Sequence, residues 1–170
     1  MKIVISKNLI LRDYDAKDKD LLYQNSIDPI FLKYLEYKKF SKSKFNLWLK
    51  EKISSKNTIF FVIEYEKKAI GTYVLSFTGI RGQICNLGYG ISSEHFGKKI
   101  FQKVTKKILY KFHKIKKFSA VTRADNLQSI NGLKKLKFEI EGILRSHYYD
   151  LKTNKFHDAI ILSYLRVKKK

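Results

Sequence analysis

Cysteine, proline and acidic residues are all scarce in this chain of 170 residues. The single cysteine, Cys85, excludes an intrachain disulfide and is typical of a reducing compartment. No apolar run approaches the roughly 20 residues that span a bilayer, and Met1–Ile10 lacks the cationic start and apolar stretch of a secretory signal. We therefore expect a cytoplasmic protein that does not associate with a membrane.

Acidic residues are so few that the chain carries a formal charge of +21, from 36 lysines and arginines against 15 aspartates and glutamates. The excess is concentrated in residues 92–137, which hold 13 basic and 2 acidic side chains. Such a balance favours anionic partners, such as nucleic acid, phosphates or an acidic protein. A general preference for lysine throughout the chain is the alternative explanation, and both stay open at this point.

What the chain does contain is a folded composition, with 44% hydrophobic and 14% aromatic residues. Its length and the absence of linkers predict one domain over residues 1–166 and a basic tail over 167–170. Alternating and β-branched runs predict strands over 8–14, 58–65, 69–78, 83–92, 118–124, 138–150 and 156–166. Helical spacing predicts helices over 15–26, 29–37, 41–53, 97–113 and 125–138. This order predicts an α/β (or α+β) fold in which helices flank a mixed sheet.

The segment "GYGISSEHFGKKIF", Gly88–Phe101, joins a strand to a lysine-rich helix through Gly97. The N-terminus of a helix exposes unpaired N–H groups and a partial positive charge, which together bind phosphate. A glycine there lets a ligand approach the backbone closely. Taken alone, the segment predicts either an anion site or an ordinary connection between a strand and a helix.

Five segments follow one another along the chain: "NLILRDYDAKDKDLLYQNSIDP", "AIGTYVLSF", "NLGYGISSEHFGKKIFQKV", "ADNLQSINGLKKLKFEIEGILR" and "NKFHDAIILSYL". Together they resemble the GNAT (GCN5-related N-acetyltransferase) superfamily, and most closely its RimJ/RimL-like branch. The resemblance covers almost the whole chain. It implies a single GNAT-like domain with a mixed, mostly antiparallel central sheet. It also implies an acyltransferase that takes acetyl-CoA as its donor and an amine as its acceptor.

The resemblance also assigns roles to particular residues. The pyrophosphate of acetyl-CoA would be held by the loop residues Phe96, Gly97, Lys98, Lys99, Ile100 and Phe101. Asn126 would contact the arm of the cofactor, and the N–H of Ile91 or Ser92 would polarise the thioester carbonyl. Ser129 would contact the cofactor and protonate the departing thiolate, because the sulfur has to be neutralised as it leaves.

Three positions depart from the pattern of the family. Lys99 and Lys137 each stand where the family usually has glycine, and Glu94 replaces an arginine or glutamine. A lysine at position 99 must either avoid a positive φ or accept strain. A weakened or altered cofactor site is therefore one expectation, and an intact loop is the other.

The general base is the least determined part of the site. The branch's ribosomal-protein enzyme has a glutamate where this chain has Tyr148, and the strand glutamate before the Gly-Tyr pair is Asn86 here. His147 has a suitable ordinary pKa of about 6.5, but neighbours on a strand point to opposite faces, so His147 and Tyr148 cannot both face the acceptor. A water relay without a dedicated base is equally compatible. The other titratable residues nearby are Asp150, His157 and Asp158.

The acceptor is left open by the sequence. The C-terminal segment is similar to members of the family that acetylate nucleotide-linked amino sugars, which makes a small anionic acceptor our first expectation. A ribosomal or other protein N-terminus, an aminoglycoside and a polyamine are rivals, and the polyamine fits a cationic protein least. A non-catalytic module that binds nucleic acid or the ribosome is the alternative outside the enzyme class.

Three further residue classes receive interpretations that need no special chemistry. The four histidines show no metal-ligand spacing, so no metal is expected. Cys85 is expected to be a buried strand residue. Trp48, Tyr34, Tyr37 and Phe40 belong either to the core or to the wall of an acceptor pocket.

Overall fold

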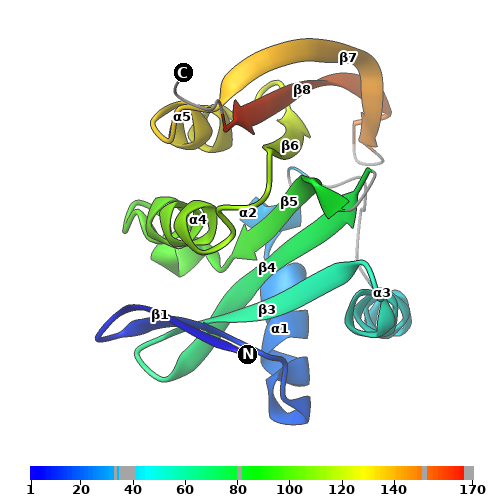
Figure 1. Ribbon diagram of the computed structural model, residues 1–170. Helices are drawn as coiled ribbons and strands as arrows, with labels where there is room; N and C mark the ends of the chain where they lie inside the picture. Colours follow the sequence, from blue (N-terminus) through cyan, green and yellow to red (C-terminus); the bar gives the residue numbers. More distant parts are fainter. Residues whose placement is uncertain (33, 35–40, 80–81, 151–152, 167–170) are drawn as a thin grey trace.

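An eight-stranded sheet in the order β1-β2-β3-β4-β5-β6-β8-β7 is the centre of the protein (Figure 1). The computed structural model describes residues 1–32, 34, 41–79, 82–150 and 153–166. All neighbouring strands in the described sheet pair antiparallel except β5 and β6, which are parallel. The strands are β1 (Lys2–Ser6), β2 (Leu9–Arg12), β3 (Thr58–Tyr65), β4 (Lys68–Thr78), β5 (Ile84–Ile91), β6 (Lys117–Arg123), β7 (Glu139–Asp150) and β8 (Lys155–Leu165).

Helices cover both faces of the sheet. Successive side chains on a strand point to opposite faces, so one strand supplies apolar side chains to the cores on both sides. On β3, Phe61 and Ile63 join a core with α4 and α5, whereas Phe60 and Val62 join a second core with α1 and α3. The helices are α1 (Lys19–Ser26), α2 (Pro29–Leu32), α3 (Lys42–Ser54), α4 (Ile100–Lys111) and α5 (Leu127–Lys134), with 3₁₀ turns η1 (Ala16–Asp18) and η3 (Ser93–His95). No helix in the described ranges is long and apolar enough to cross a membrane.

The sheet splits between β5 and β6, and this split positions the site. The two strands pair from Ile84 with Lys117 to Asn86 with Ser119. Beyond this point β5 continues to Ile91 and β6 to Arg123, with no further pairing between them among the described residues. In Figure 1 the strands β6, β8 and β7 curve away from the rest of the sheet. The carboxyl ends of the two central strands are therefore open to a ligand.

A close contact between β4 and β5 explains the Ile-Gly pair on β4. Gly71 pairs with Ile91, and a Cβ at Gly71 would lie 2.1 Å from the Gly90 carbonyl oxygen. Only glycine fits at this position. The end of β5 that borders the split is thereby held firmly against β4.

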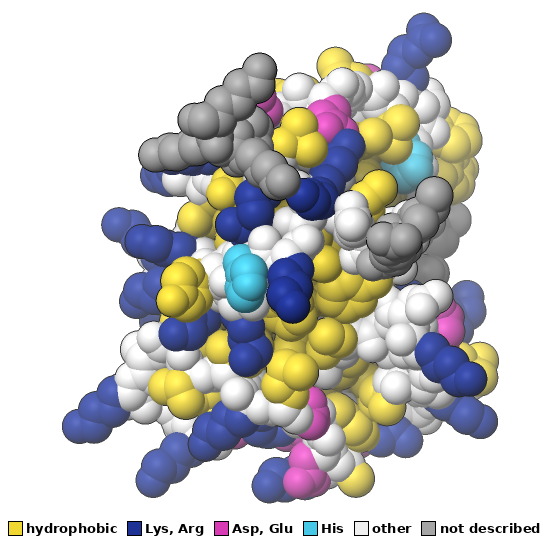
Figure 2. Space-filling model, in the orientation of Figure 1, with side chains coloured by type: hydrophobic (Ala, Val, Ile, Leu, Met, Phe, Trp, Pro, Cys, Tyr) yellow, Lys and Arg dark blue, Asp and Glu magenta, His cyan; other side chains and the backbone are white. Residues whose placement is uncertain are grey.

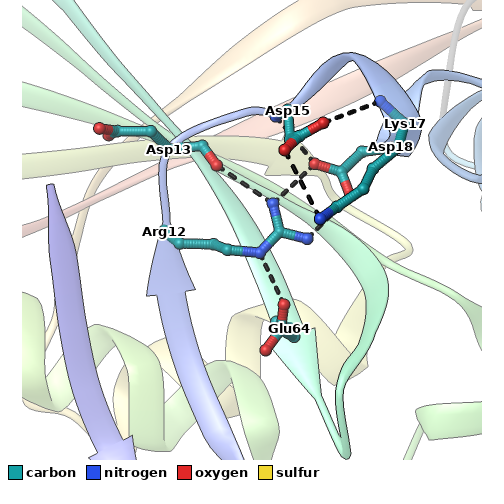
Figure 3. Close-up of polar contacts among 6 residues, drawn as sticks. All are labelled: Arg12, Asp13, Asp15, Lys17, Asp18 and Glu64. Carbon is teal, nitrogen blue, oxygen red and sulfur yellow. Dashed lines mark hydrogen bonds and ion pairs between the residues drawn. The ribbon is translucent and has the colours of Figure 1, made fainter.

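A charged cluster around Arg12 fixes the start of α1 to the sheet (Figure 3). The Arg12 guanidinium donates to both carboxylate oxygens of Asp18, at 2.6 and 2.7 Å, and to Glu64 of β3 at 2.6 Å. Asp18 is 4% exposed and also accepts from the Asp15 N–H, at 2.9 Å. Bidentate contacts of this kind are among the stronger hydrogen bonds in proteins. They hold β2, β3 and α1 in one arrangement.

The structure confirms the predicted fold class and every predicted strand, and it corrects two details. A further strand, β1, precedes the first predicted one, and its pattern was weak because only Ile3 is buried in it. The helix predicted from Gly97 begins at Ile100 instead. The helix predicted over 29–37 begins as α2, and its remainder, apart from residue 34, lies outside the described residues, as do Tyr37, Phe40 and the tail 167–170.

Candidate active site

A cleft of about 630 Å³ follows the split between β5 and β6 and continues between α1, α3 and β4. Its donor half is lined by β5, the loop before α4, the end of β6 and the start of α5. Its other half is lined by residues of α1, α3 and β4 together with Tyr34. Figure 2 shows hydrophobic side chains gathered in the middle of this face, with lysines and arginines spread around them. No aspartate or glutamate occurs among the described residues that line the cleft.

The loop before α4 has the backbone that an anion site requires. Gly97 has a φ of 80°, and Lys99, at the N-cap of α4, has a φ of 56° in the left-handed region. Lys99 thus takes the conformation of the glycine that it replaces, at the cost of strain. The first N–H groups of α4, from Ile100 onward, have no partner within the helix. The loop geometry is therefore compatible with phosphate binding, and Gly97, Lys99, Ile100 and Phe101 all line the cleft.

Two of the predicted loop residues do not offer the expected groups. The Phe96 N–H donates to the Ser93 carbonyl at 3.0 Å, so its amide is already used, although its side chain lines the cleft. The Lys98 ammonium lies 3.1 Å from His95 Nδ1 and 5.5 Å from the centre of the Tyr65 ring. The side chain of Lys98 is therefore directed to His95 and Tyr65, and Lys98 is not among the described residues that line the cleft.

The open edge of β5 presents backbone groups to the split. The Ser92 N–H donates to the Ile70 carbonyl at 2.8 Å and faces β4. Because alternate residues of a strand direct their backbone polar groups to opposite edges, the N–H groups of Ile91 and Tyr89 face the split. The Ser92 N–H thus does not fit the role of polarising a thioester carbonyl, because the sheet already uses it, and the Ile91 N–H keeps that role as a prediction.

Ser129 and Asn126 lie together at the start of α5, opposite the open edge of β5. The Asn126 side chain caps the helix, accepting from the Ser129 N–H at 3.2 Å. The Ser129 hydroxyl lies 2.5 Å from the Tyr89 hydroxyl, in a hydrogen bond between α5 and β5. All three residues line the cleft. Capping engages the Asn126 carbonyl oxygen once, and the amide nitrogen of the same side chain can donate to a ligand.

A stack of aromatic rings supports Tyr89 from behind. Its ring lies 3.9 Å from that of Phe101, at 20° to it, and 6.1 Å from that of Tyr73 on β4. Burial raises the pKa of Tyr89 to about 12, although the hydrogen bond to Ser129 lowers it in part. The phenol therefore keeps its proton throughout the physiological range. A Cβ on Gly132 of α5 would lie 3.3 Å from the Phe101 ring, so glycine allows the two helices to meet here.

Tyr148 lines the cleft, whereas His147 is exposed and does not occur among the described lining residues. This agrees with the expectation that only one of the two neighbours faces the acceptor. Between Leu144 and Tyr148 the register of β7 shifts, and Ser146 has a φ of 51°. The irregularity directs Tyr148 toward the split.

The remaining base candidates have other partners. Asp150 lies 3.7 Å from both Arg123 Nη1 and His157 Nε2, and the Asp158 carboxylate accepts from the Ser146 N–H at 2.8 Å. These contacts stabilise the hairpin of β7 and β8. Asn86 does line the cleft, but a carboxamide does not titrate.

His95 is a lining residue to which the sequence analysis gave no role. Burial, together with the neighbouring Lys98 charge, lowers the pKa of His95 below its ordinary value of 6.5. It is therefore neutral near pH 7 and able to accept a proton. Tyr89 and Lys52 were missed as site residues too. The only signal for Tyr89 was the Gly-Tyr pair of the strand motif, and nothing in the pattern singled out Lys52.

The half of the cleft away from the loop has an aromatic wall. Phe45, Trp48 and Lys52 recur at three- and four-residue steps and so share one face of α3. The Phe45 and Trp48 rings lie 5.8 Å apart, and Tyr34 lines the same half. Trp48 thus belongs to both the second core and the cleft wall. The Asn25 side-chain nitrogen is buried here and has no hydrogen-bond partner among the described residues.

Cys85 is not among the described residues that line the cleft. Cys85 is fully buried in β5, and burial raises its pKa to about 12, so it remains a thiol. No cluster of three or more potential metal ligands occurs in the part of the chain that the structure describes.

Comparison with known proteins gives one consistent result. Residues 8–139 match the sequence model of the acetyltransferase (GNAT) domain. The uncharacterized N-acetyltransferase p20 of Bacillus licheniformis is 24% identical over 175 residues, covering 98% of this chain and 97% of that protein.

Solved structures share the fold. A Salmonella typhimurium acetyltransferase that modifies the N-terminal serine of ribosomal protein L7/L12 has a TM-score of 0.84 at 16% identity, over 98% of this chain and 100% of that chain. The microcin C7 self-immunity acetyltransferase MccE, solved with acetyl-CoA and AMP, has a TM-score of 0.80 at 20% identity, over 95% and 94% of the two chains. Both likenesses confirm the predicted architecture.

Proposed function

Because this chain belongs to the GNAT acetyltransferase family, whose domain it matches over residues 8–139, we propose that it transfers the acetyl group of acetyl-CoA directly to a primary amine. The observation that carries this proposal is the split between β5 and β6, bordered by a left-handed loop, a helix N-terminus and Ser129. The lone cysteine fits our further proposal that the enzyme works in the reducing cytoplasm.

The residues around the split fit acetyl-CoA. The N–H groups at the start of α4 suit its pyrophosphate, and the open edge of β5, with the N–H group of Tyr89, suits the amides of its pantetheine arm. Acetyl-CoA supplies an activated acetyl thioester. Lys99 adds positive charge at the loop, and no described carboxylate lines the cleft to oppose the phosphates.

Each group near the reacting atoms has a proposed task. The Ile91 N–H polarises the thioester carbonyl, and Ser129 donates its proton to the departing sulfur. The acceptor amine must be neutral to attack, and water in the cleft takes its proton. Tyr148 positions the acceptor, because the contacts of Asp150 with Arg123 and His157 hold the end of β7 from which the Tyr148 ring enters the cleft.

For the acceptor we propose a small anionic molecule with a ring, such as a nucleotide-linked amino sugar. Three features of the acceptor half support this choice. Trp48, which is half-buried and packs on Phe45, offers flat apolar surface for a ring. Lys52, one turn beyond Trp48, offers positive charge, since its pairing with exposed Glu51 at 3.2 Å is weak. The unpartnered Asn25 nitrogen offers a donor to a hydroxyl or carbonyl group.

Release of CoA from a panel of amines tests the acceptor. A nucleotide-linked amino sugar is compared with a peptide that carries a free N-terminus, an aminoglycoside and a polyamine. We expect the anionic sugar to have the highest kcat/KM. Selective turnover of the peptide would replace our acceptor with a protein N-terminus, and absence of turnover with every amine would contradict the transferase assignment under these conditions.

The variant Lys52→Ala tests whether Lys52 contacts the anionic acceptor. We expect it to raise KM for the anionic acceptor about tenfold, the size of one charge-assisted contact, with kcat and the KM for acetyl-CoA unchanged. Lys50→Ala, on the same helix but outside the cleft lining, is the matched control and should behave as the wild type. Equal effects of both variants would exclude a specific contact.

A further inference from the structure

The hydrogen bond between Tyr89 and Ser129 joins two elements that the sequence separates by 40 residues. It is short, at 2.5 Å between the oxygens, and it lies at the edge of the cleft where both residues are lining residues. The Tyr89 ring stacks on Phe101 at 3.9 Å and lies nearly parallel to Tyr73 at 6.1 Å. A side chain packed against two neighbouring rings has little freedom to turn its hydroxyl elsewhere.

We propose that Tyr89 is the positioning residue of Ser129, donating its phenolic proton to the serine oxygen so that the serine proton is directed at the departing sulfur. The phenol is the stronger acid of the two hydroxyls and hence the better donor, whereas the serine oxygen has two lone pairs with which to accept. If the serine donated to the tyrosine instead, it would have no proton left for the sulfur. This inference rests on the proposed transferase function.

The protons released and taken up in the reaction are equal in number, and Tyr89 does not lose its own proton. The acceptor nitrogen forms a bond to the acetyl carbon and gives one proton to water, while the bond between that carbon and sulfur breaks. Ser129 gives its hydroxyl proton to the sulfur and then regains one from water in the cleft. Tyr89 stays protonated throughout, since burial raises its pKa to about 12.

The structure provides a matched control one strand away. Tyr73, the cross-strand partner of Tyr89, is fully buried, and its hydroxyl lies 2.9 Å from the Thr105 hydroxyl. Tyr73→Phe therefore removes the same kind of bond from the same ring stack, but Tyr73 is not among the residues lining the cleft. Both Tyr→Phe variants keep their rings, so a difference between them reports the hydroxyl.

Steady-state kinetics give the first readout. We expect Ser129→Ala to lower kcat about 100-fold, as for loss of a general acid, and Tyr89→Phe to lower it about tenfold with KM for acetyl-CoA unchanged. The double variant should be no slower than Ser129→Ala, because Tyr89 acts through the serine. Tyr73→Phe should keep wild-type kcat. A wild-type kcat in Tyr89→Phe, or strictly multiplicative effects in the double variant, would overturn the inference.

A second readout needs neither donor nor acceptor. In the free protein labelled with ¹³C at the tyrosine ζ carbon, the Tyr89 resonance is assigned by its absence in Tyr89→Phe. We expect it to move in Ser129→Ala and to stay in place in Thr105→Ser. An unmoved Tyr89 resonance in Ser129→Ala would show that the two hydroxyls are not bonded. Inactivity of the wild type with every acceptor would instead contradict the proposed function, so the two failures are distinguishable.

Discussion

At the scale of single residues, two lysines of this protein adopt a backbone conformation with a positive φ, which glycine would adopt at lower cost. Lys99 and Lys137 have φ angles of 56° and 66°, in the left-handed region that glycine adopts at little cost. Lys137 follows α5, where the Phe138 N–H donates to the Leu133 carbonyl at 3.1 Å across the end of the helix. The hydrogen bonds that end α5 therefore impose the conformation on Lys137.

Replacing Lys137 by glycine should raise the free energy of unfolding by about 1 kcal/mol, because it removes the left-handed strain. The measurement is urea denaturation of the wild type and the variant. Lys135→Gly is the control, since Lys135 has an ordinary helical φ of −61° and glycine there should lower stability by roughly 0.5–1 kcal/mol. Lower stability in both variants would mean that position 137 is not strained.

The sequence indicated which residues belong to the cleft only where a motif contained them. Asn126, Ser129 and the loop around Gly97 were placed by the resemblance, and the structure brings them to one cleft. The bond between Tyr89 and Ser129 was not predictable, because it depends on how a strand and a helix 40 residues apart are packed together. The hydrogen bond from the Ser92 N–H to the Ile70 carbonyl could not be predicted either, because the residue types do not reveal which backbone groups pair between strands.

At the scale of elements, the site depends on strands and helices whose positions relative to one another are fixed. The Arg12 cluster is the clearest case, since it joins β2, β3 and the start of α1, and α1 in turn forms part of the acceptor wall. The alternation of apolar residues in strands and their helical spacing in helices predicted nearly all of the strands and helices. The hydrophobic pattern did not indicate the split between β5 and β6, because it reports which face of a strand is buried and not where the pairing of the strand ends.

Removing the charge of Asp18 should loosen α1 from the sheet. Burial raises the pKa of Asp18, but the Arg12 guanidinium and the Asp15 N–H lower it by more, so the net shift is below the ordinary 3.8. A carboxylate with a lowered folded pKa stabilises the fold fully above about pH 4, and this stabilisation is lost as pH falls through the folded pKa. Asp18→Asn should therefore cost about 3 kcal/mol at pH 7.

The test follows the urea midpoints of wild type and Asp18→Asn from pH 7 to pH 3. The difference between them should be constant down to about pH 4 and shrink below it. Asp20→Asn is the control, because Asp20 is 79% exposed and, within the described part of the chain, pairs only with exposed Lys42, so its effect should stay within about 0.5 kcal/mol. A difference that grows toward low pH would contradict the assigned role of Asp18.

At the scale of the whole molecule, the charge of +21 is spread over the surface, and it also enters the cleft. Lys52, Lys99 and Arg123 line the cleft, and Arg123 is neutralised by Asp125 at 2.7 Å. Exposed lysines follow the outer side of α4 as well, while its inner side packs on the sheet. The positive field attracts the phosphates of acetyl-CoA and disfavours a polyamine acceptor.

The central claim is that the split between β5 and β6 holds acetyl-CoA, and amide hydrogen exchange with and without acetyl-CoA tests it most directly. The account predicts that saturating acetyl-CoA slows exchange at Tyr89 and Ile91 and across residues 97–102, while amides of the β1–β2 hairpin are unchanged. Binding that leaves Tyr89, Ile91 and the loop unprotected, or protection confined to other strands, would contradict it.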